Sequence, residues 1–115
     1  MIIPDILPEL AQASASDWVW VDVRTEAEFY GPMGHVPGAL HVPLGMALMH
    51  FLEGADSDKA YIFVCAHGFR SAKAAGLALQ KGFSQVKNLK GGTENWIQQN
   101  LPVVHETPDA CVPTP

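Results

Sequence analysis

Short apolar runs at regular intervals along the chain predict the strands of a buried sheet. Residues 18–23 form a dense run of β-branched and aromatic side chains, which is typical of a strand covered on both faces. Residues 61–64 are a second run of this kind, and residues 86–89 are a third. Residues 39–43 have the composition of a further, short strand.

Helical segments are expected between and around these strands, separated by turns rich in glycine and proline. Residues 30–38, which hold three glycines and two prolines, predict a loop. The predicted helices cover residues 5–12 with Asp5 as N-cap, residues 44–52, residues 70–81 with Gly82 beyond the last turn, and residues 93–99 with Thr93 as N-cap.

Strands that alternate with helices indicate an α/β fold with a small, mainly parallel sheet and right-handed crossovers. Binding sites in such sheets form outside the carboxyl ends of the strands. Asp22 and Cys65 each stand at the carboxyl end of a predicted strand. The pattern alone therefore places these two residues at one edge of the sheet.

The composition fits one globular domain. The 115 residues are 48% hydrophobic and 17% charged, which is enough apolar surface for one core. We expect the domain to cover residues 1–106 and residues 107–115, with three prolines, to form a flexible tail. No apolar run is long enough to span a membrane, and no signal peptide pattern opens the chain. A cytoplasmic protein that does not bind membranes is expected.

Charge is distributed unevenly along the chain. The net charge of −5 argues against nucleic acid as a partner. Six of the seven basic residues lie between positions 59 and 93, a segment without any acidic residue. Two interpretations stay open: a chance asymmetry of surface charges, or a positive local field that attracts small anions or an acidic protein.

The most informative segment, residues 65–70, joins a predicted strand to a predicted helix through Cys65-Ala66-His67-Gly68-Phe69-Arg70. Gly68 permits the sharp reversal that such a turn requires. The backbone N–H groups of the loop and the positive end of the helix dipole create an anion site over the sulfur and lower the pKa of the thiol. Arg70 adds a permanent charge suited to an oxyanion, so Cys65 is the candidate nucleophile.

Three further side-chain questions concern histidines and the second cysteine. His67 is either a general base for Cys65 or a source of positive potential and substrate contact, and a spacing of two in a tight loop favours divergent side chains. No Cys-x-x-Cys or His-x-x-x-His spacing exists, so neither a metal nor a cofactor is expected. Cys111 is either a resolving thiol for Cys65 or an idle thiol of the tail.

Taken in order, these residues resemble the rhodanese-like family over about residues 18–103. The motifs that carry the resemblance are Val21-Asp22-Val23-Arg24, Glu28-Phe29, Gly34-His35-Val36-Pro37-Gly38-Ala39, Val42-Pro43-Leu44, Cys65-x-x-Gly68-x-Arg70-Ser71, Leu79-x-x-Gly82-Phe83-x-x-Val86 and Leu89-x-Gly91-Gly92-x-x-x-Trp96. The resemblance implies a rhodanese-like three-layer α/β/α fold. It also implies a thiosulfate sulfurtransferase, which takes sulfane sulfur from a small anionic donor and passes it to cyanide, a small thiol or an acceptor protein.

The resemblance also assigns roles to individual residues. Cys65 carries the sulfur as a persulfide, and Arg70 binds or orients the donor. Asp22 and Arg24, a charged pair at a strand end, either support the loop or take a direct part in the reaction. The other residues that the resemblance places at the site are Ala66, His67, Gly68, Phe69 and Ser71 for substrate binding, His35 for holding its own turn, and Trp96 for packing under the sheet.

The sequence departs from the family pattern in two places. Residues 29–33 are longer than the usual spacing, which predicts a reshaped rim. Ala66 and Phe69 occupy loop positions where members often carry polar or basic residues. Phe69 is expected either to cover the persulfide against water or to dock a protein acceptor.

Other functions compete with sulfur transfer as interpretations of the loop. Cysteine phosphatases and arsenate reductases of related fold place one residue more between cysteine and arginine, which makes room for a phosphate. Here four residues separate Cys65 from Arg70, which predicts a tighter cradle centred on the sulfur. Non-catalytic interaction modules of the family typically lack the loop cysteine. A persulfide relay whose acceptor is another protein stays open.

Overall fold

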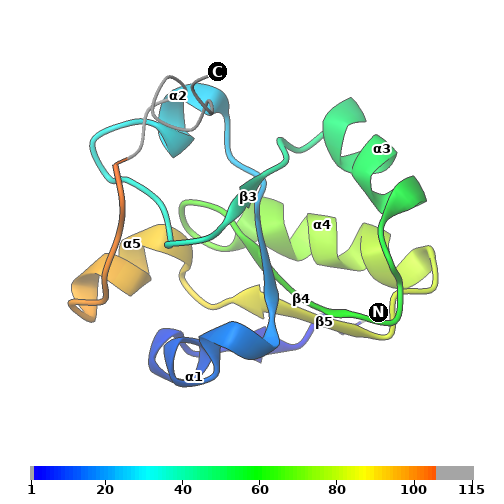
Figure 1. Ribbon diagram of the computed structural model, residues 1–115, viewed down its shortest axis with the longest axis horizontal. Helices are drawn as coiled ribbons and strands as arrows, with labels where there is room; N and C mark the ends of the chain where they lie inside the picture. The colour runs from blue at the N-terminus through cyan, green and yellow to red at the C-terminus, as the bar shows by residue number, and fades with distance from the viewer. Residues whose placement is uncertain (1, 106–115) are drawn as a thin grey trace, which may run out of the picture.

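Five strands form a central sheet that lies between two layers of helices (Figure 1). The structure is a computed structural model that describes residues 2–105, so the predicted tail at residues 107–115 and Cys111 lie outside the described residues. The strands are β1 (Asp5–Ile6), β2 (Val19–Asp22), β3 (Leu40–His41), β4 (Ala60–Val64) and β5 (Gln85–Leu89). The helices are α1 (Pro8–Ala13), α2 (Glu26–Phe29), α3 (Met46–Gly54), α4 (Phe69–Gln80) and α5 (Gly92–Gln98), with a 3-10 turn at Ala15–Asp17.

All strand pairs of the sheet are parallel, in the order β1-β5-β4-β2-β3. Val21 of β2 lies opposite both Phe63 of β4 and Leu40 of β3. Because all strands run in one direction, their carboxyl ends share one edge, where Asp22 ends β2 and Cys65 follows β4. The predicted parallel α/β sheet and the placement of both residues at this edge are confirmed.

Separate apolar cores cover the two faces of the sheet, because successive residues of a strand point to opposite sides. On one face, buried residues of α3 and α4 pack against alternate strand residues: Leu48, Leu52, Ala74, Ala75, Ala78, Val21, Phe63 and Val86. On the other face, α1 and α5 contribute buried residues to a second cluster: Ala11, Trp96, Trp20, Ile62, Val64 and Leu89. The predicted three-layer arrangement, with Trp96 under the sheet, is confirmed.

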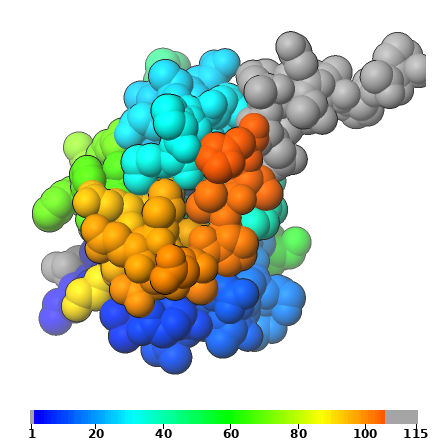
Figure 2. Space-filling view, turned by 90° about the vertical axis from the view of Figure 1, so that its left-hand side faces the viewer, coloured from blue at the N-terminus to red at the C-terminus, as the bar shows by residue number. Residues whose placement is uncertain are grey.

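The chain after α5 folds back over the loop at residues 30–38. Figure 2 shows α5 against α1 and the segment after α5 beside that loop. His35 and Val104 exchange two backbone hydrogen bonds of 2.9 Å each, an antiparallel bridge. The indole Nε1 of Trp96 donates to the carbonyl oxygen of Pro102 at 2.7 Å. These bonds fix the last described residues against the same edge of the sheet that carries Cys65.

The predicted helix at residues 5–12 is wrong in its first turn. Asp5 and Ile6 form the edge strand β1, which pairs with Asn88 and Leu89 of β5. The helix begins later, at Pro8, a first-turn position where the missing N–H of proline has no intrahelical acceptor to lose. Asp5 is therefore no N-cap. Its carboxylate accepts a hydrogen bond from Asn88 Nδ2 at 3.1 Å.

The four-residue helix α2 was not predicted. Thr25 closes its first turn with a capping box: its hydroxyl accepts from the Glu28 N–H, and the Glu28 carboxylate accepts from the Thr25 N–H. The other predicted helices are confirmed, α4 with Gly82 at a positive φ of 93° beyond its end. Among residues 2–105, no helix is long and apolar enough to cross a membrane.

Candidate active site at the Cys65 loop

Cys65 lies at the base of a tight loop between β4 and α4. Gly68, the last loop residue, has a φ of 101°, in the left-handed region that glycine adopts without strain. This conformation turns the Gly68 N–H back toward the sulfur, and it donates to Cys65 Sγ at 3.0 Å. The inward direction predicted for the loop amides is confirmed at this residue.

Hydrogen-bond donors around the sulfur favour its ionised form. The Ser71 hydroxyl lies 3.2 Å from Cys65 Sγ. Burial alone would raise the pKa of the Cys65 thiol, but donation from the Ser71 hydroxyl and from the backbone N–H groups of Ser71, His67 and Gly68 outweighs burial and lowers that pKa. These contacts therefore favour the thiolate, which is the reactive form of a cysteine.

The N-terminus of α5 orients the peptide groups of the loop. The N–H groups of Thr93 and Glu94 donate to the carbonyl oxygens of Cys65 and Ala66, at 2.9 and 3.1 Å. Because C=O and N–H point in opposite directions across a trans peptide, the N–H groups of Ala66 and His67 face away from α5. Thr93 is not the N-cap that the sequence predicts. Gly91 takes that position, and the buried Thr93 hydroxyl donates to the Cys65 carbonyl oxygen.

The Arg70 guanidinium is held by a carboxylate from α2. Its Nη1 and Nη2 donate to Oε1 and Oε2 of Glu28, at 2.7 and 2.8 Å. The bond from Arg70 outweighs partial burial and, with help from Thr25, lowers the pKa of Glu28 to about 2. Glu28 raises the pKa of Arg70 in return, with smaller contributions from Cys65 and Asp22. Arg70 thus lies within electrostatic reach of the sulfur, but its fork is occupied.

His67 and Phe69 project outward from the loop. His67 Nδ1 pairs with the Glu94 carboxylate, and its side chain is 62% exposed. This pairing disfavours a general-base role for His67. Phe69 is 84% exposed, so its ring packs on little of the protein. That exposure disfavours the interpretation in which Phe69 covers the persulfide, and it favours contact with a partner.

A buried ion pair stands at the end of β2. Asp22 and Arg24 are almost fully buried, and Arg24 Nε and Nη2 donate to the two Asp22 oxygens at 2.9–3.1 Å. Arg24 Nη2 also donates to the Gly34 carbonyl oxygen at 2.8 Å. A buried pair of this kind is stable only while its polar atoms have partners. The geometry favours the supporting role for both residues, because they tie the loop at residues 30–38 to the sheet edge.

His35 contacts residues outside its own turn. It is buried, its ring stacks on Phe29 with centroids 3.6 Å apart, and its Nδ1 lies 2.7 Å from the Phe29 carbonyl oxygen. Its backbone forms the bridge to Val104. His35 therefore connects α2 to the last described residues.

The segment at residues 59–93 contains no acidic residue, but acidic residues from other parts of the chain lie next to it. Carboxylates from outside it, Glu28 and Glu94, pair with Arg70 and His67. Because the two cationic or ionisable side chains of the loop have acidic partners, the positive field over the loop is weaker than the sequence indicates.

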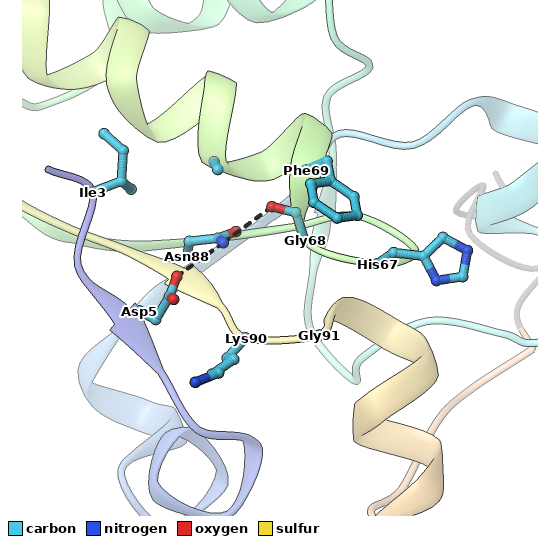
Figure 3. Close-up of a pocket in the computed structure, with 9 residues that line it drawn as sticks. Ile3, Asp5, His67, Gly68, Phe69, Asn88, Lys90 and Gly91 are labelled. Atoms are coloured by element: carbon cyan, nitrogen blue, oxygen red, sulfur yellow. Dashed lines mark hydrogen bonds between the residues drawn. The ribbon is translucent and has the colours of Figure 1, made fainter. Parts of the chain in front are cut away.

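Two pockets lie next to the loop. One of about 330 Å³ is lined by residues in or next to β1, β5, the loop and the start of α4 (Figure 3): Ile3, Asp5, His67, Gly68, Phe69, Ala72, Asn88, Lys90 and Gly91. The other, of about 240 Å³, lies between Arg24 and Glu28 on one side and Pro32 and Met33 of the long stretch at residues 29–33 on the other. Cys65 is 1% exposed and lines neither pocket. These two pockets therefore do not extend to the sulfur.

Three residues that shape the site were not predicted: Glu28, Asn88 and Glu94. Glu28 carried a readable signal, because Thr25 and Glu28 form the Thr-x-x-Glu pattern of a capping box. Asn88 and Glu94 carried none, because their partners Ser71 and His67 lie on other elements of the chain.

Comparison with known proteins identifies the family. Residues 7–99 match the family described as rhodanese-like domain. The chain is 34% identical over 92 residues to a sulfurtransferase of Allochromatium vinosum, covering 80% of this chain and 83% of that one. It is 39% identical over 92 residues to the thiosulfate sulfurtransferase GlpE of Pseudomonas fluorescens, covering 79% and 82%. A solved structure from Rhodopseudomonas palustris, described as a protein of unknown function and possible tyrosine phosphatase, is 31% identical with a TM-score of 0.78, covering 89% and 85%. The chain belongs to the rhodanese-like domain family.

Proposed function

We propose that this protein is a sulfurtransferase that carries sulfane sulfur as a persulfide on Cys65. The donor is a small anion such as thiosulfate, and the acceptor is a thiophile such as cyanide or a protein thiol. The observation that carries the proposal is the convergence of the Gly68 N–H and the Ser71 hydroxyl on Cys65 Sγ. Donors at that atom stabilise a thiolate before the reaction begins.

The proposed reaction has two steps. The Cys65 thiolate attacks the outer sulfur of thiosulfate, a bond from Sγ to that sulfur forms, the sulfur–sulfur bond of thiosulfate breaks, and sulfite leaves with the electron pair. The negative charge then resides on the outer sulfur of the persulfide. A thiolate or cyanide next attacks the outer sulfur, the bond between the two sulfurs breaks, and Cys65 regains its charge. No redox partner is needed, since each attack is balanced by one leaving group.

Phosphate chemistry is the rival that the similarity to a possible tyrosine phosphatase brings to the fore. A phosphate cradle directs its N–H groups at a space beyond the sulfur, where the phosphoryl oxygens lie. Here the Gly68 N–H is directed at the sulfur itself, at 3.0 Å. The loop between Cys65 and Arg70 holds four residues, which leaves less room than a phosphatase loop. Both features support sulfur transfer.

The wild-type protein tests the proposal directly. After incubation with thiosulfate and removal of small molecules, intact-protein mass spectrometry is expected to show the gain of one sulfur atom per chain. A parallel assay with an aryl phosphate ester is expected to show no hydrolysis. Phosphate release together with an unchanged mass after exposure to thiosulfate and mercaptopyruvate would replace sulfur transfer by the phosphatase alternative.

A donor anion must compete with Glu28 for Arg70, because both terminal nitrogens of Arg70 already bind that carboxylate. Glu28→Gln removes the charge and keeps an oxygen for the Thr25 N–H, so α2 stays capped. We expect the KM for thiosulfate to fall about two- to fivefold, the scale of a partly exposed ion pair.

Arg70→Ala is expected to lower kcat/KM for thiosulfate. The decrease should correspond to a loss of roughly 1.5–3 kcal/mol in transition-state stabilisation, the scale of a hydrogen bond to a charged group.

Glu26→Gln is the matched control, because Glu26 lies in the same helix and is exposed. It removes one negative charge without touching Arg70, so steady-state kinetics with thiosulfate should be unchanged. A higher KM in Glu28→Gln would mean that Glu28 positions Arg70 for the donor instead of competing with it. An unchanged kcat/KM in Arg70→Ala would remove Arg70 from the donor site.

An acceptor protein is favoured by the exposure of Phe69. A large aromatic side chain that is 84% exposed beside the nucleophile suits a contact that forms only in a complex. The protein then acts as a persulfide relay, with slow discharge to free cyanide and fast discharge to its partner thiol. A reducing, cytoplasmic location suits this role, since it keeps the Cys65 thiol available.

A further inference from the structure

The Ser71 hydroxyl has one proton and two acceptors within reach. Its oxygen lies 3.2 Å from Cys65 Sγ and 2.5 Å from Asn88 Oδ1. Ser71 is fully buried and Asn88 nearly so. A hydroxyl group donates through a single O–H, so Ser71 binds the sulfur or the amide oxygen at any moment. The Ser71 hydroxyl therefore donates either to Cys65 Sγ or to Asn88 Oδ1 of β5.

The orientation of the Asn88 amide follows from its other contacts. Asn88 Nδ2 donates to Asp5 Oδ1 and to the Gly68 carbonyl oxygen, both at 3.1 Å (Figure 3). Both partners are acceptors only, so the amide nitrogen must face them and Oδ1 must face Ser71. Asp5 in β1 and Gly68 in the loop thus hold Asn88 as an acceptor for the hydroxyl.

We infer that Asn88 is a positioning residue that gives the Ser71 hydroxyl a second acceptor when the charge on Cys65 Sγ is lost. This inference rests on the proposed sulfur transfer. In the free enzyme Ser71 donates to the Sγ thiolate. When thiosulfate loads the enzyme and sulfite leaves, the negative charge moves from Sγ to the outer sulfur, and Sγ becomes a weak acceptor. The hydroxyl then turns to Asn88 Oδ1.

The exchange of acceptors matters because the hydroxyl is buried. A buried hydroxyl without a partner is destabilising, and the loaded enzyme would carry this cost if residue 88 were apolar. With Asn88 in place, Ser71 has a partner in both states of the cycle. The Asn88 amide oxygen consequently competes with the Cys65 thiolate for the Ser71 O–H, and it stabilises the persulfide state relative to the thiolate.

Other charged groups near the sulfur stay constant in the variants used to test this. Arg70 of α4 is paired with Glu28 of α2, and Asp22 is paired with Arg24 at the end of β2. His67 and Glu94 pair on the outer side of the loop, and Asp5 lies beyond Asn88. The substitutions at positions 71 and 88 keep all of these charges, and Asn88→Val removes only the hydrogen bond that Asp5 accepts.

The test measures how the rate of Cys65 alkylation by iodoacetamide depends on pH. Four proteins are compared: the reference, Ser71→Ala, Asn88→Val and the double variant, all carrying Cys111→Ser so that only Cys65 reacts. The midpoint is the pH at which the alkylation rate reaches half of its maximum. Ser71→Ala is expected to raise this midpoint by about one pH unit, since it removes a donor to the thiolate. Asn88→Val is expected to lower the midpoint, since Ser71 then donates to sulfur alone. In the Ser71→Ala background, Asn88→Val should have no further effect.

The pattern across the four proteins distinguishes this role from a purely structural one. Equal shifts from Asn88→Val in both backgrounds, or no shift in either, would overturn the inference. Valine suits a strand, and Gly68 O keeps the Ala72 N–H as a donor, so the variant leaves no carbonyl without a partner. Gln85→Val, an exposed change in the same strand, should leave the midpoint unchanged. If Asn88→Val does not fold, Asn88→Leu, which is closer to asparagine in shape, repeats the comparison.

The inference and the proposed function fail in different ways. The inference fails if wild-type protein loads sulfur from thiosulfate normally while the midpoints do not follow the expected pattern. The proposed function fails if no sulfane donor loads the wild-type protein, whatever the midpoints show. Loading is followed by intact mass and the midpoint by alkylation rate, so the two outcomes are measured independently.

Discussion

Cys65→Ser is expected to abolish sulfur loading completely, since the serine hydroxyl is far too weak an acid for the loop to ionise. The Gly68 N–H and Ser71 hydroxyl donate to Cys65 Sγ and lower the pKa of its thiol, whereas a neutral serine hydroxyl does not attack sulfane sulfur. Intact-protein mass spectrometry after thiosulfate treatment should show an unchanged mass. The thermal midpoint should stay close to that of the wild type, because serine is slightly smaller than cysteine and finds the same donors.

Cys111→Ser is the matched control, because it changes the other cysteine of the chain in the same way. It should load one sulfur at the wild-type rate. If Cys111 acts as a resolving thiol, the persulfide on Cys65 will last longer in this variant than in the wild type. Sulfur gain in Cys65→Ser that disappears in the double variant would move the nucleophile to Cys111 and contradict the assignment.

The sheet could be predicted because its strands carry their own signal. Residues 18–23 and 61–64 are covered on both faces, so each reads as a continuous apolar run wherever it lies in the fold. Asp5 shows where this reasoning fails. A two-residue edge strand gives no periodicity, and an aspartate before an apolar turn resembles an N-cap. Only the pairing with Asn88, 83 positions away, decides the outcome.

The site could be predicted where one loop supplies both partners. Cys65 and Gly68 are three residues apart, so the turn itself brings the N–H to the sulfur. The state of Arg70 could not be predicted in this way, because Glu28 lies 42 positions from it and belongs to a helix that was not foreseen. A permanent charge next to a nucleophile suggests an open anion site, but its availability depends on tertiary pairing.

The turn between β5 and α5 has a larger role than the sequence indicates. It brings the first N–H groups of α5 to the carbonyl oxygens of Cys65 and Ala66, which fixes the direction of the loop peptides. Helix N-termini commonly bind anions through these N–H groups. In this protein they bind the outer side of the loop instead, and the inner side becomes the donor surface around Cys65 Sγ.

Gly92→Ala is therefore expected to damage both stability and sulfur loading. A Cβ at position 92 would collide with the carbonyl groups of Cys65 and Ala66, and the φ of 65° disfavours any side chain. Backbone atoms cannot give way as a flexible side chain does, so we expect a loss of at least about 3 kcal/mol in unfolding free energy. The loop peptides must shift with the collision, and loading by thiosulfate should slow by at least about tenfold, which corresponds to roughly 1.4 kcal/mol.

Gly38→Ala separates the collision from the backbone strain, because Gly38 has a similar positive φ of 81° but no atom within 4 Å of the place that an alanine Cβ would take. Its expected cost is the strain alone, about 1–2 kcal/mol, with loading unchanged. Urea unfolding of the two variants gives the difference in their free energies of unfolding. Intact-protein mass spectrometry of samples quenched at set times gives the loading rates. Equal destabilisation and equal loading in both would show that α5 does not orient the loop. A Gly92→Ala protein that is stable but does not load sulfur would contradict the expected loss of stability and would support only the link between peptide direction and chemistry.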